Sequence, residues 1–182
     1  AEYFGLPEIA KFWEEVVHIN TWHKHRISKL IVKKLLGTVI GKRICILGFS
    51  FKANTNDTRE SAAIQICKDL LEEGAFLSIH DPKVDPKQIA LDLNIEQDED
   101  INNEASKICK ESGWISSNLE NVFLNADAIL IMTDWEEYFS INWLEESKKM
   151  RSPSWVFDTR SVTEPSKVRE AGLKLWRIGD GS

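Results

Sequence analysis

The stretch Arg43–Cys67, RICILGFSFKANTNDTRESAAIQIC, reads as an apolar strand, a polar loop and a helix. Strand, loop and helix in this order form the frame in which α/β proteins hold nucleotides. A dinucleotide-binding loop needs the glycines of G-x-G-x-x-G, so that its backbone can approach the pyrophosphate closely. Here Gly48 stands alone and is followed by Phe49-Ser50-Phe51. The loop is therefore not a dinucleotide fingerprint, and its length beyond the usual two to six or so residues indicates a function of its own.

Strands and helices alternate along the rest of the chain after this stretch. Apolar strands are expected at 75–81, 127–133, 154–160 and 174–179, and helices at 60–74, around 119–124 and at 141–150. Continuous apolar strands that alternate with helices are buried on both faces. The fold class is therefore α/β, with a doubly wound, mostly parallel, Rossmann-like sheet flanked by helices. The acidic stretch 96–107 lacks a clean period and is interpreted as a solvated loop that runs into a helix.

A long helix is expected upstream, from Leu6 to Leu36, because apolar residues recur there at helical spacing. Pro7 suits its first turn, and Gly37 suits its end. An apolar stripe of this length needs a partner, either the following domain or a second subunit. Three histidines in this helix have no acidic residues at metal-ligand spacing and are interpreted as solvated or interfacial: His18, His23 and His25.

The composition excludes several classes of function. With 182 residues, of which 42% are hydrophobic, the chain can bury one good core. The net charge of -6 argues against a nucleic-acid scaffold, which would show a basic face. The apolar runs are too short to span a bilayer, and no signal peptide is recognised. Cys45, Cys67 and Cys109 lack the spacing of a redox or metal pair, so they are interpreted as reduced packing residues of a cytoplasmic protein.

Charged side chains follow the carboxyl ends of the expected strands, where α/β sheets bind ligands. Lys52 and Arg59 lie in the loop after the first strand, and Arg160 follows the strand that contains VFD. The sequence DTRE predicts a capping box with Asp57 as N-cap and Glu60 as its partner, which puts Arg59 on the first helical turn. An arginine is electrostatically unfavourable there unless an anion joins it.

Each of these cations also has a purely structural interpretation. Arg59 can pair with a nearby aspartate, Lys52 can be a plain surface lysine, and Arg160 is as compatible with a salt bridge as with a ligand. Taken together at one edge of the sheet, they predict a pocket for a nucleotide diphosphate. Phe51 would offer a ring face to the base or sugar, and Trp135 is a possible wall of the pocket.

Four segments resemble the C-terminal half of the UDP-glucose/GDP-mannose dehydrogenase family: GFSFKANTNDTRES, SIHDPK, ILIMTDWEEY and VFDTR. LPEIAKFWEEVVHIN is similar to the helix that joins the family's two domains, so the likeness covers nearly the whole chain. NTNDTRES and TDWEEY resemble the UDP-glucose branch more than the GDP-mannose or N-acetylmannosamine branches. On this resemblance, residues 1–37 are the C-terminal part of the central inter-domain and dimerisation helix, and residues 38–182 are the UDP-sugar-binding domain.

The resemblance implies an activity for the parent protein, namely the oxidation of UDP-glucose to UDP-glucuronate. The family carries this out in two successive NAD-dependent steps through a cysteine thioester, with NAD on the N-terminal domain and UDP on the C-terminal domain. By position, Phe51, Lys52 and Arg160 match substrate-binding residues, and Arg59 matches the arginine that reaches NAD. The long helix would form the core of a homodimer.

The chain also departs from the family. G-x-G-x-x-G does not occur, and none of the cysteines lies in the glycine-rich setting of the family's nucleophile. The catalytic residues are therefore expected upstream of Ala1, and these 182 residues alone are expected to be inactive. DTRS also lacks the second arginine often found at this place in the family. Three alternatives stay open: a dehydrogenase of another nucleotide sugar, a stand-alone nucleotide-binding module, and a structural or oligomerisation domain.

Overall fold

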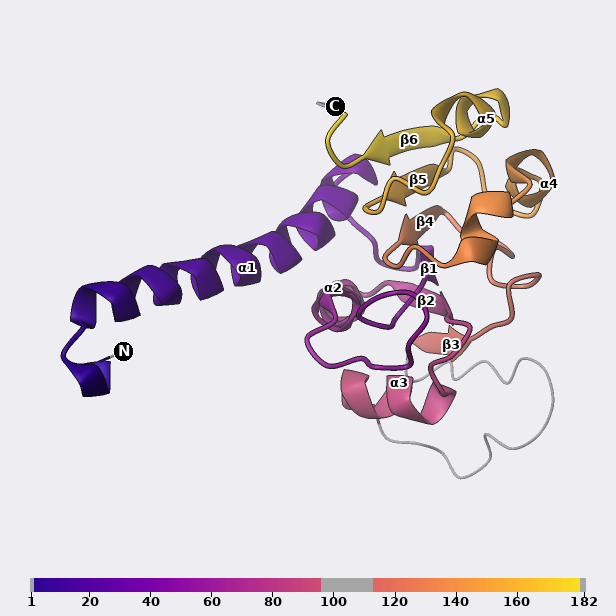
Figure 1. Cartoon of the computed structure of the whole chain (residues 1–182). Helices are drawn as coiled ribbons and strands as arrows, with labels where there is room; N and C mark the ends of the chain where they lie inside the picture. Colours follow the sequence, from indigo (N-terminus) through magenta and orange to yellow (C-terminus); the bar gives the residue numbers. More distant parts are fainter. Residues whose placement is uncertain (1, 96–112, 181–182) are drawn as a thin grey trace.

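The computed structural model describes residues 2–95 and 113–180, and within them six strands form one sheet (Figure 1). The strands are β1 (Arg43–Leu47), β2 (Phe76–His80), β3 (Trp114–Ser116), β4 (Ala128–Ile131), β5 (Trp155–Asp158) and β6 (Lys174–Arg177). They lie in the order β3-β2-β1-β4-β5-β6, and every neighbouring pair is parallel. This is the strand order of a Rossmann-type sheet, so the expected fold class is confirmed.

The segments that follow the strands are mostly short helices. They are α2 (Ala62–Glu72), α3 (Pro86–Leu93), the 3-10 helix η2 (Glu136–Ser140), α4 (Trp143–Ser147) and α5 (Pro165–Glu170). The helix expected around 119–124 is wrong, because the chain forms hydrogen-bonded turns there. The sequence analysis did not predict the short elements β3, α3, η2 and α5. The acidic stretch 96–107 lies outside the described residues.

Helices cover both faces of the sheet, which explains why its strands are apolar throughout. Ile44 and Ile46 of β1 belong to the core beneath α2, α3 and the end of the long helix α1 (Pro7–Lys34). Cys45 and Leu47 belong to a second core, beneath η2, α4 and α5. Alternate residues of one strand thus face two separate hydrophobic layers, as the two-residue period of a strand requires.

The helix α1 is the long helix that the sequence predicted, and only its C-terminal part packs on the α/β body. Its buried residues are Ile27, Ser28 and Ile31. Beside them, Asp69 of α2 accepts hydrogen bonds from Ser28 and from Gln65, and its carboxylate lies 2.8 Å from His25 Nδ1. Burial acts against ionisation of Asp69, but these three partners outweigh it and lower its pKa. One polar cluster therefore fixes α1 to α2.

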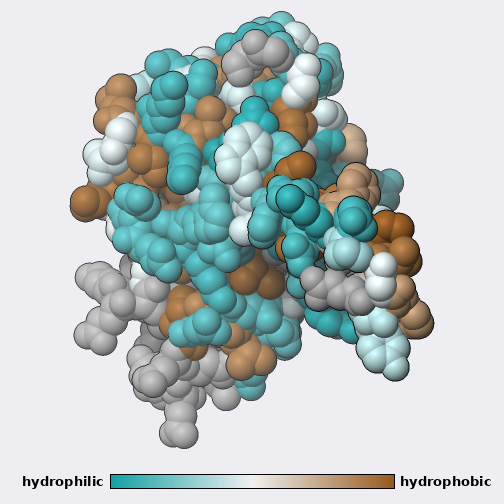
Figure 2. All heavy atoms as spheres, turned by 90° about the vertical axis from the view of Figure 1, so that its left-hand side faces the viewer, coloured by the Kyte–Doolittle hydropathy of each residue, from teal (hydrophilic) through white to brown (hydrophobic). Residues whose placement is uncertain are grey.

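The N-terminal part of α1 extends away from the body, as Figure 1 shows. Phe12, Trp13 and Val17 are 62%, 60% and 61% exposed. Figure 2 looks at this side of the molecule and shows hydrophobic side chains at the surface among hydrophilic ones. An unpartnered apolar stripe on a helix is unusual for a monomer in water. The expectation that this helix needs a partner therefore stands.

No helix among the described residues is both long enough and apolar enough to cross a bilayer. Cys45 and Cys67 are buried free thiols, and burial raises the pKa of each. A thiol with a raised pKa is a poor nucleophile at neutral pH, so both cysteines serve as packing residues. Cys109 lies outside the described residues.

Candidate functional site

Four strands end at the same level of the sheet, and their following loops meet at its carboxyl edge. Leu47 of β1 is in register with His80 of β2 and Ile131 of β4, and Ile131 is in register with Asp158 of β5. The loops after β1, β2, β4 and β5 therefore start side by side. This row is where ligands bind in parallel α/β sheets.

The loop 48–61 begins with a glycine that the packing of two strands requires. Gly48 has a φ of +91°, and a Cβ at this position would lie 2.4 Å from the Cβ of Thr133, beyond the end of β4. The Thr133 hydroxyl in turn donates to the carbonyl of Ser50 at 2.9 Å. Gly48 is therefore needed for close contact between the β1 and β4 loops, and no phosphate has to be invoked to explain it.

The backbone of the loop is fixed to its neighbours, while two of its side chains point to solvent. Phe49 is fully buried, and the Phe51 N–H donates to the carbonyl of Asp57 at 2.8 Å. The Phe51 ring is 50% exposed, and Lys52 is exposed beside it. Among the described residues, no carboxylate lies within ion-pair distance of the Lys52 ammonium. Two consecutive residues of the loop thus expose an aromatic ring and an ammonium group.

Arg59 is placed differently from the expectation. The N-cap of α2 is Ser61, whose hydroxyl accepts the N–H of Ala63, so the capping box with Asp57 as N-cap is wrong. Arg59 lies in the loop before the helix and donates from Nε and Nη2 to Asp57 at 2.9 and 2.7 Å. These hydrogen bonds lower the pKa of Asp57 to about 2. The local pair corresponds to the structural interpretation of Arg59, because Asp57 already supplies an anion.

Arg160 lies in the turn after β5, and its guanidinium is anchored to a backbone carbonyl. Its Nε donates to the carbonyl of Met132 at 2.7 Å, at the end of the adjacent strand β4. Its backbone N–H donates to Asp158 Oδ1 at 2.9 Å, and Asp158 Oδ2 accepts both the N–H and the hydroxyl of Thr163. No carboxylate in the described ranges pairs with the Arg160 guanidinium. Within residues 2–95 and 113–180, the salt-bridge interpretation of Arg160 therefore finds no partner.

The three cations lie at one edge of the sheet, as the sequence predicts. Lys52 and Arg59 leave the end of β1, and Arg160 leaves the end of β5 and is held at the end of β4 between them. Two of them, Lys52 and Arg160, have no carboxylate partner among the described residues, whereas Arg59 is paired. This edge can therefore attract an anion with two charge-bearing side chains from separate loops.

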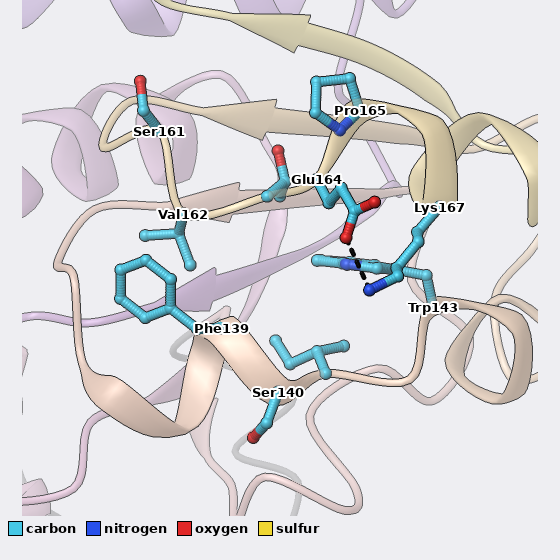
Figure 3. Close-up of a pocket in the computed structure, with 10 residues that line it drawn as sticks. Phe139, Ser140, Trp143, Ser161, Val162, Glu164, Pro165 and Lys167 are labelled. Atoms are coloured by element: carbon cyan, nitrogen blue, oxygen red, sulfur yellow. Dashed lines mark ion pairs between the residues drawn. The ribbon is translucent and has the colours of Figure 1, made fainter.

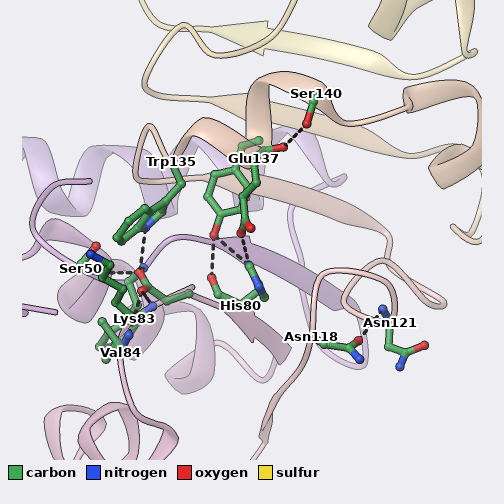
Figure 4. A network of polar contacts seen from close by, with 12 residues as sticks. Ser50, His80, Lys83, Val84, Asn118, Asn121, Trp135, Glu137 and Ser140 are labelled. Carbon is green, nitrogen blue, oxygen red and sulfur yellow. Dashed lines mark hydrogen bonds and ion pairs between the residues drawn. The ribbon is translucent and has the colours of Figure 1, made fainter. Parts of the chain in front are cut away.

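Sequence reasoning missed Asp81, just after β2, which joins the loops after β1 and β4. Figure 4 labels its partners Ser50 and Trp135 in this network. Asp81 Oδ2 accepts the N–H groups of Phe49 and Ser50 at 2.8 and 3.0 Å, and the indole N–H of Trp135 at 3.2 Å. Trp135 is only 5% exposed and packs in the second core, so its expected role as a pocket wall stays a prediction. The Asp-Pro pair that ends the strand marks a turn, but nothing in it identifies these long-range donors.

A buried histidine and tyrosine lie next to Asp81. The Nδ1 atom of His80 is 2.9 Å from the Tyr138 hydroxyl, which also contacts the His80 carbonyl at 3.1 Å. Burial lowers the pKa of His80, although Asp81 works in the opposite direction. His80 is therefore neutral at pH 7, and its ring supports the packing of η2 on the sheet.

A pocket of about 490 Å³ lies next to the Arg160 turn, between η2 and the start of α5 (Figure 3). Phe139, Trp143 and Val162 are among its lining residues, and the sequence analysis missed all of them. Its cation, Lys167, lies 2.6 Å from Glu164 and is thereby neutralised. Phe51, Lys52, Arg59 and Arg160 are not among its lining residues, although Ser161, the neighbour of Arg160, is.

The described residues do not fit a dinucleotide. The two residues after Gly48, Phe49 and Ser50, are buried, and no further glycine lets the loop approach a pyrophosphate. Asp81 occupies the place where a dinucleotide fold offers an acidic residue to the ribose, but five N–H groups already occupy its oxygens. Nor do the described residues contain a cluster of three or more His, Cys, Asp or Glu side chains that could hold a metal ion.

Comparisons with known proteins agree with this geometry. The family model described as the UDP binding domain of the UDP-glucose/GDP-mannose dehydrogenase family matches residues 45–165. UDP-glucose 6-dehydrogenase from Drosophila melanogaster is 38% identical over 178 residues, which cover 98% of this chain and 37% of that protein. The protein of the same name from Caenorhabditis elegans is 35% identical over 179 residues, which cover 98% of this chain and 36% of that protein. The chain thus spans little more than a third of these relatives.

Solved structures show the same fold. The UDP-glucose dehydrogenase from Pyrobaculum islandicum has a TM-score of 0.61 at 23% sequence identity, over 90% of this chain and 31% of that one. The UDP-D-ManNAc dehydrogenase from Pyrococcus horikoshii has a TM-score of 0.59 at 25% identity, over 82% of this chain and 28% of that one. Both names describe dehydrogenases of UDP-linked sugars.

Proposed function

The chain belongs to the UDP-glucose/GDP-mannose dehydrogenase family, and from this premise we propose that it is the substrate-binding half of an NAD-dependent UDP-glucose 6-dehydrogenase. The parent protein would oxidise UDP-glucose to UDP-glucuronate. Residues 38–182 would bind the UDP moiety, and residues 1–37 would connect this domain to the part of the protein that binds NAD. The identity of 38% to a protein of that activity supports this assignment over other nucleotide sugars.

The observation that carries the proposal is the pair of uncompensated cations at the carboxyl edge. In our proposal, Lys52 and Arg160 bind the negatively charged nucleotide sugar, since neither has a carboxylate partner among the described residues. The carbonyl of Met132 holds the Nε atom of Arg160, so the terminal nitrogens of its guanidinium are left for the ligand. The half-exposed Phe51 would stack on the base or sugar.

Arg59 has a separate proposed role. We assign it to the contact with NAD, held by the rest of the protein, because this chain has no dinucleotide loop of its own. Its side chain is 88% exposed, and its pairing with Asp57 uses Nε and Nη2. The ion pair would hold the arginine extended from the loop, with one terminal nitrogen free to donate.

The exposed apolar stripe of α1 supports the proposed partners of this chain. We propose that α1 pairs with a second copy of itself and with the N-terminal domain of its own chain. Phe12, Trp13 and Val17 would be buried in this assembly, and their present exposure of about 60% is what an isolated half of an interface shows.

Calorimetry with UDP tests the proposed site. We expect the wild-type chain to bind UDP, and Arg160→Ala to weaken binding by about 1–3 kcal/mol, because a charge-assisted hydrogen bond is lost. Lys52→Ala should act in the same direction, and UDP should compete better than GDP. Lys42→Ala is the matched control, because Lys42 stands before β1 at the opposite edge of the sheet. Equal affinities of all three variants would contradict the proposed site.

The 182 residues alone should not turn over UDP-glucose in the presence of NAD. Cys45 and Cys67 are buried with raised pKa values, so neither can act as the nucleophile, and no dinucleotide loop is present. The measurement is the absorbance of NADH at saturating UDP-glucose and NAD. Steady NADH production by the wild-type chain would contradict the proposed division of roles, and the Cys45→Ser/Cys67→Ser double variant would show whether either thiol takes part.

A further inference from the structure

Beyond the residues that would touch the ligand, we infer that Asp81 is a positioning residue for the substrate-binding loop. Its carboxylate fixes the backbone from which Phe51 and Lys52 extend. The inference rests on the proposed function, because it concerns how the proposed UDP site is held in place. Asp81 itself follows β2 and belongs to neither the loop 48–61 nor the Arg160 turn.

The geometry places one carboxylate between three loops (Figure 4). Its Oδ2 accepts the N–H groups of Phe49 and Ser50, which lie 32 and 31 residues away in sequence. The same oxygen accepts the indole N–H of Trp135, 54 residues away. Its Oδ1 accepts the N–H groups of Lys83 and Val84 at 2.9 and 3.0 Å, which closes the turn after β2. Each carboxylate oxygen thus has a separate set of donors.

The contacts continue from Asp81 through Ser50 to Lys52. Ser50 is 1% exposed, and its N–H donates to Asp81. Its carbonyl accepts the Thr133 hydroxyl, and its own hydroxyl donates to the carbonyl of Lys52 at 3.1 Å. The residue just before Phe51 is therefore held on three sides. Loss of the Asp81 contact would leave the buried N–H of Ser50 without an acceptor, and the segment that carries Lys52 would become less rigid.

The electrostatics explain why this carboxylate can stand near an anion site. The charge of Asp81 is spread over five hydrogen bonds from N–H groups. The Asp81 carboxylate forms no ion pair with Lys52, because no carboxylate among the described residues lies within ion-pair distance of the Lys52 ammonium. Asp81 therefore fixes the backbone of the loop without forming an ion pair with Lys52, whose positive charge stays available to a ligand.

A double-mutant cycle on the 182-residue chain separates positioning from general stability. UDP affinity is measured by calorimetry for wild type, Lys52→Ala, Asp81→Asn and the double variant. The asparagine puts an N–H₂ group against N–H donors on one side and so breaks one set of contacts. We expect Lys52→Ala to weaken UDP binding about tenfold in the wild-type background but less than about threefold in the Asp81→Asn background. The Asp81→Asn change alone should weaken binding about tenfold.

Asp85→Asn is the matched control, because Asp85 also accepts a backbone N–H, that of Lys87, but caps α3 outside the loop. In this background Lys52→Ala should keep its full effect of about tenfold. If Asp81→Asn does not fold, as judged by circular dichroism, Asp81→Glu replaces it, since it keeps the charge but shifts both oxygens. A full Lys52 effect in the Asp81→Asn or Asp81→Glu background would overturn the inference. A wild-type chain that does not bind UDP would instead refute the proposed function.

Discussion

The loop 48–61 and the turn 158–163 both present a cation at the same edge of the sheet, but the aspartates that hold their backbones lie at different distances along the chain. The backbone of the turn is capped locally, because Asp158 accepts from residues two and five positions further along the chain, while the side chains of Thr159 and Arg160 donate to carbonyls at the end of β4. The loop is held from a distance, by Asp81 from 31 and 32 residues away and by Thr133 from 83 residues away. A binding edge can thus combine one segment whose backbone is capped by its own aspartate with another whose backbone is held by an aspartate from a neighbouring strand end.

The largest effect should come from Gly48, at the start of the loop held from a distance. Gly48→Ala should lower the free energy of unfolding by more than about 3 kcal/mol, because the new Cβ would lie 2.4 Å from Thr133 Cβ and the φ is +91°. Gly172→Ala is the control, since φ there is +77° but a Cβ would meet no atom within 4 Å. It should cost only about 1 kcal/mol. Urea unfolding measures the free energy of unfolding of both variants. Equal losses would mean that the contact with Thr133 does not contribute to the effect at Gly48.

The second-largest effect on the free energy of unfolding is expected in the turn 158–163. Asp158→Asn should lower the free energy of unfolding by about 2 kcal/mol, because the buried carboxylate loses an acceptor for Arg160 N–H or for Thr163. Asp134→Asn, an exposed change in the loop after β4, should leave the free energy nearly unchanged. Thermal unfolding of both variants measures the difference. A stable Asp158→Asn variant would mean that the turn does not depend on its local carboxylate.

The smallest effect concerns the one local pair inside the loop, Arg59 with Asp57. The pKa of Asp57 is lowered to about 2, so the stabilisation from the pair is present above pH about 4 and is lost as the pH falls through 2. Arg59→Ala should raise the Asp57 pKa toward 3.8, as followed by NMR titration of the carboxyl carbon. Arg160→Ala should leave that pKa unchanged. Arg59 is exposed and Asp57 is partly exposed, so overall stability should change little.

The local patterns in the sequence predicted those parts of the fold that depend on short-range contacts. The apolar runs of β1, β2, β4, β5 and β6, the period of α1, and the stops at Gly37 and Gly74 all follow from neighbouring residues. The same reasoning failed where two local signals compete. DTRE resembles a capping box, but Asp57 is engaged by Arg59, and the serine two residues after Arg59 caps α2.

By itself the sequence determined the strand–helix alternation, and with it the edge at which Lys52, Arg59 and Arg160 would meet, because parallel strands all end on one side of the sheet. Which of these cations lacks a carboxylate partner among the described residues follows only from the three-dimensional contacts. Hydrogen bonds and ion pairs depend on distances of about 3 Å between atoms, and the separation of two residues in sequence carries no such information. The roles of Asp81 and Trp135 became visible only when strands distant in sequence were brought into register.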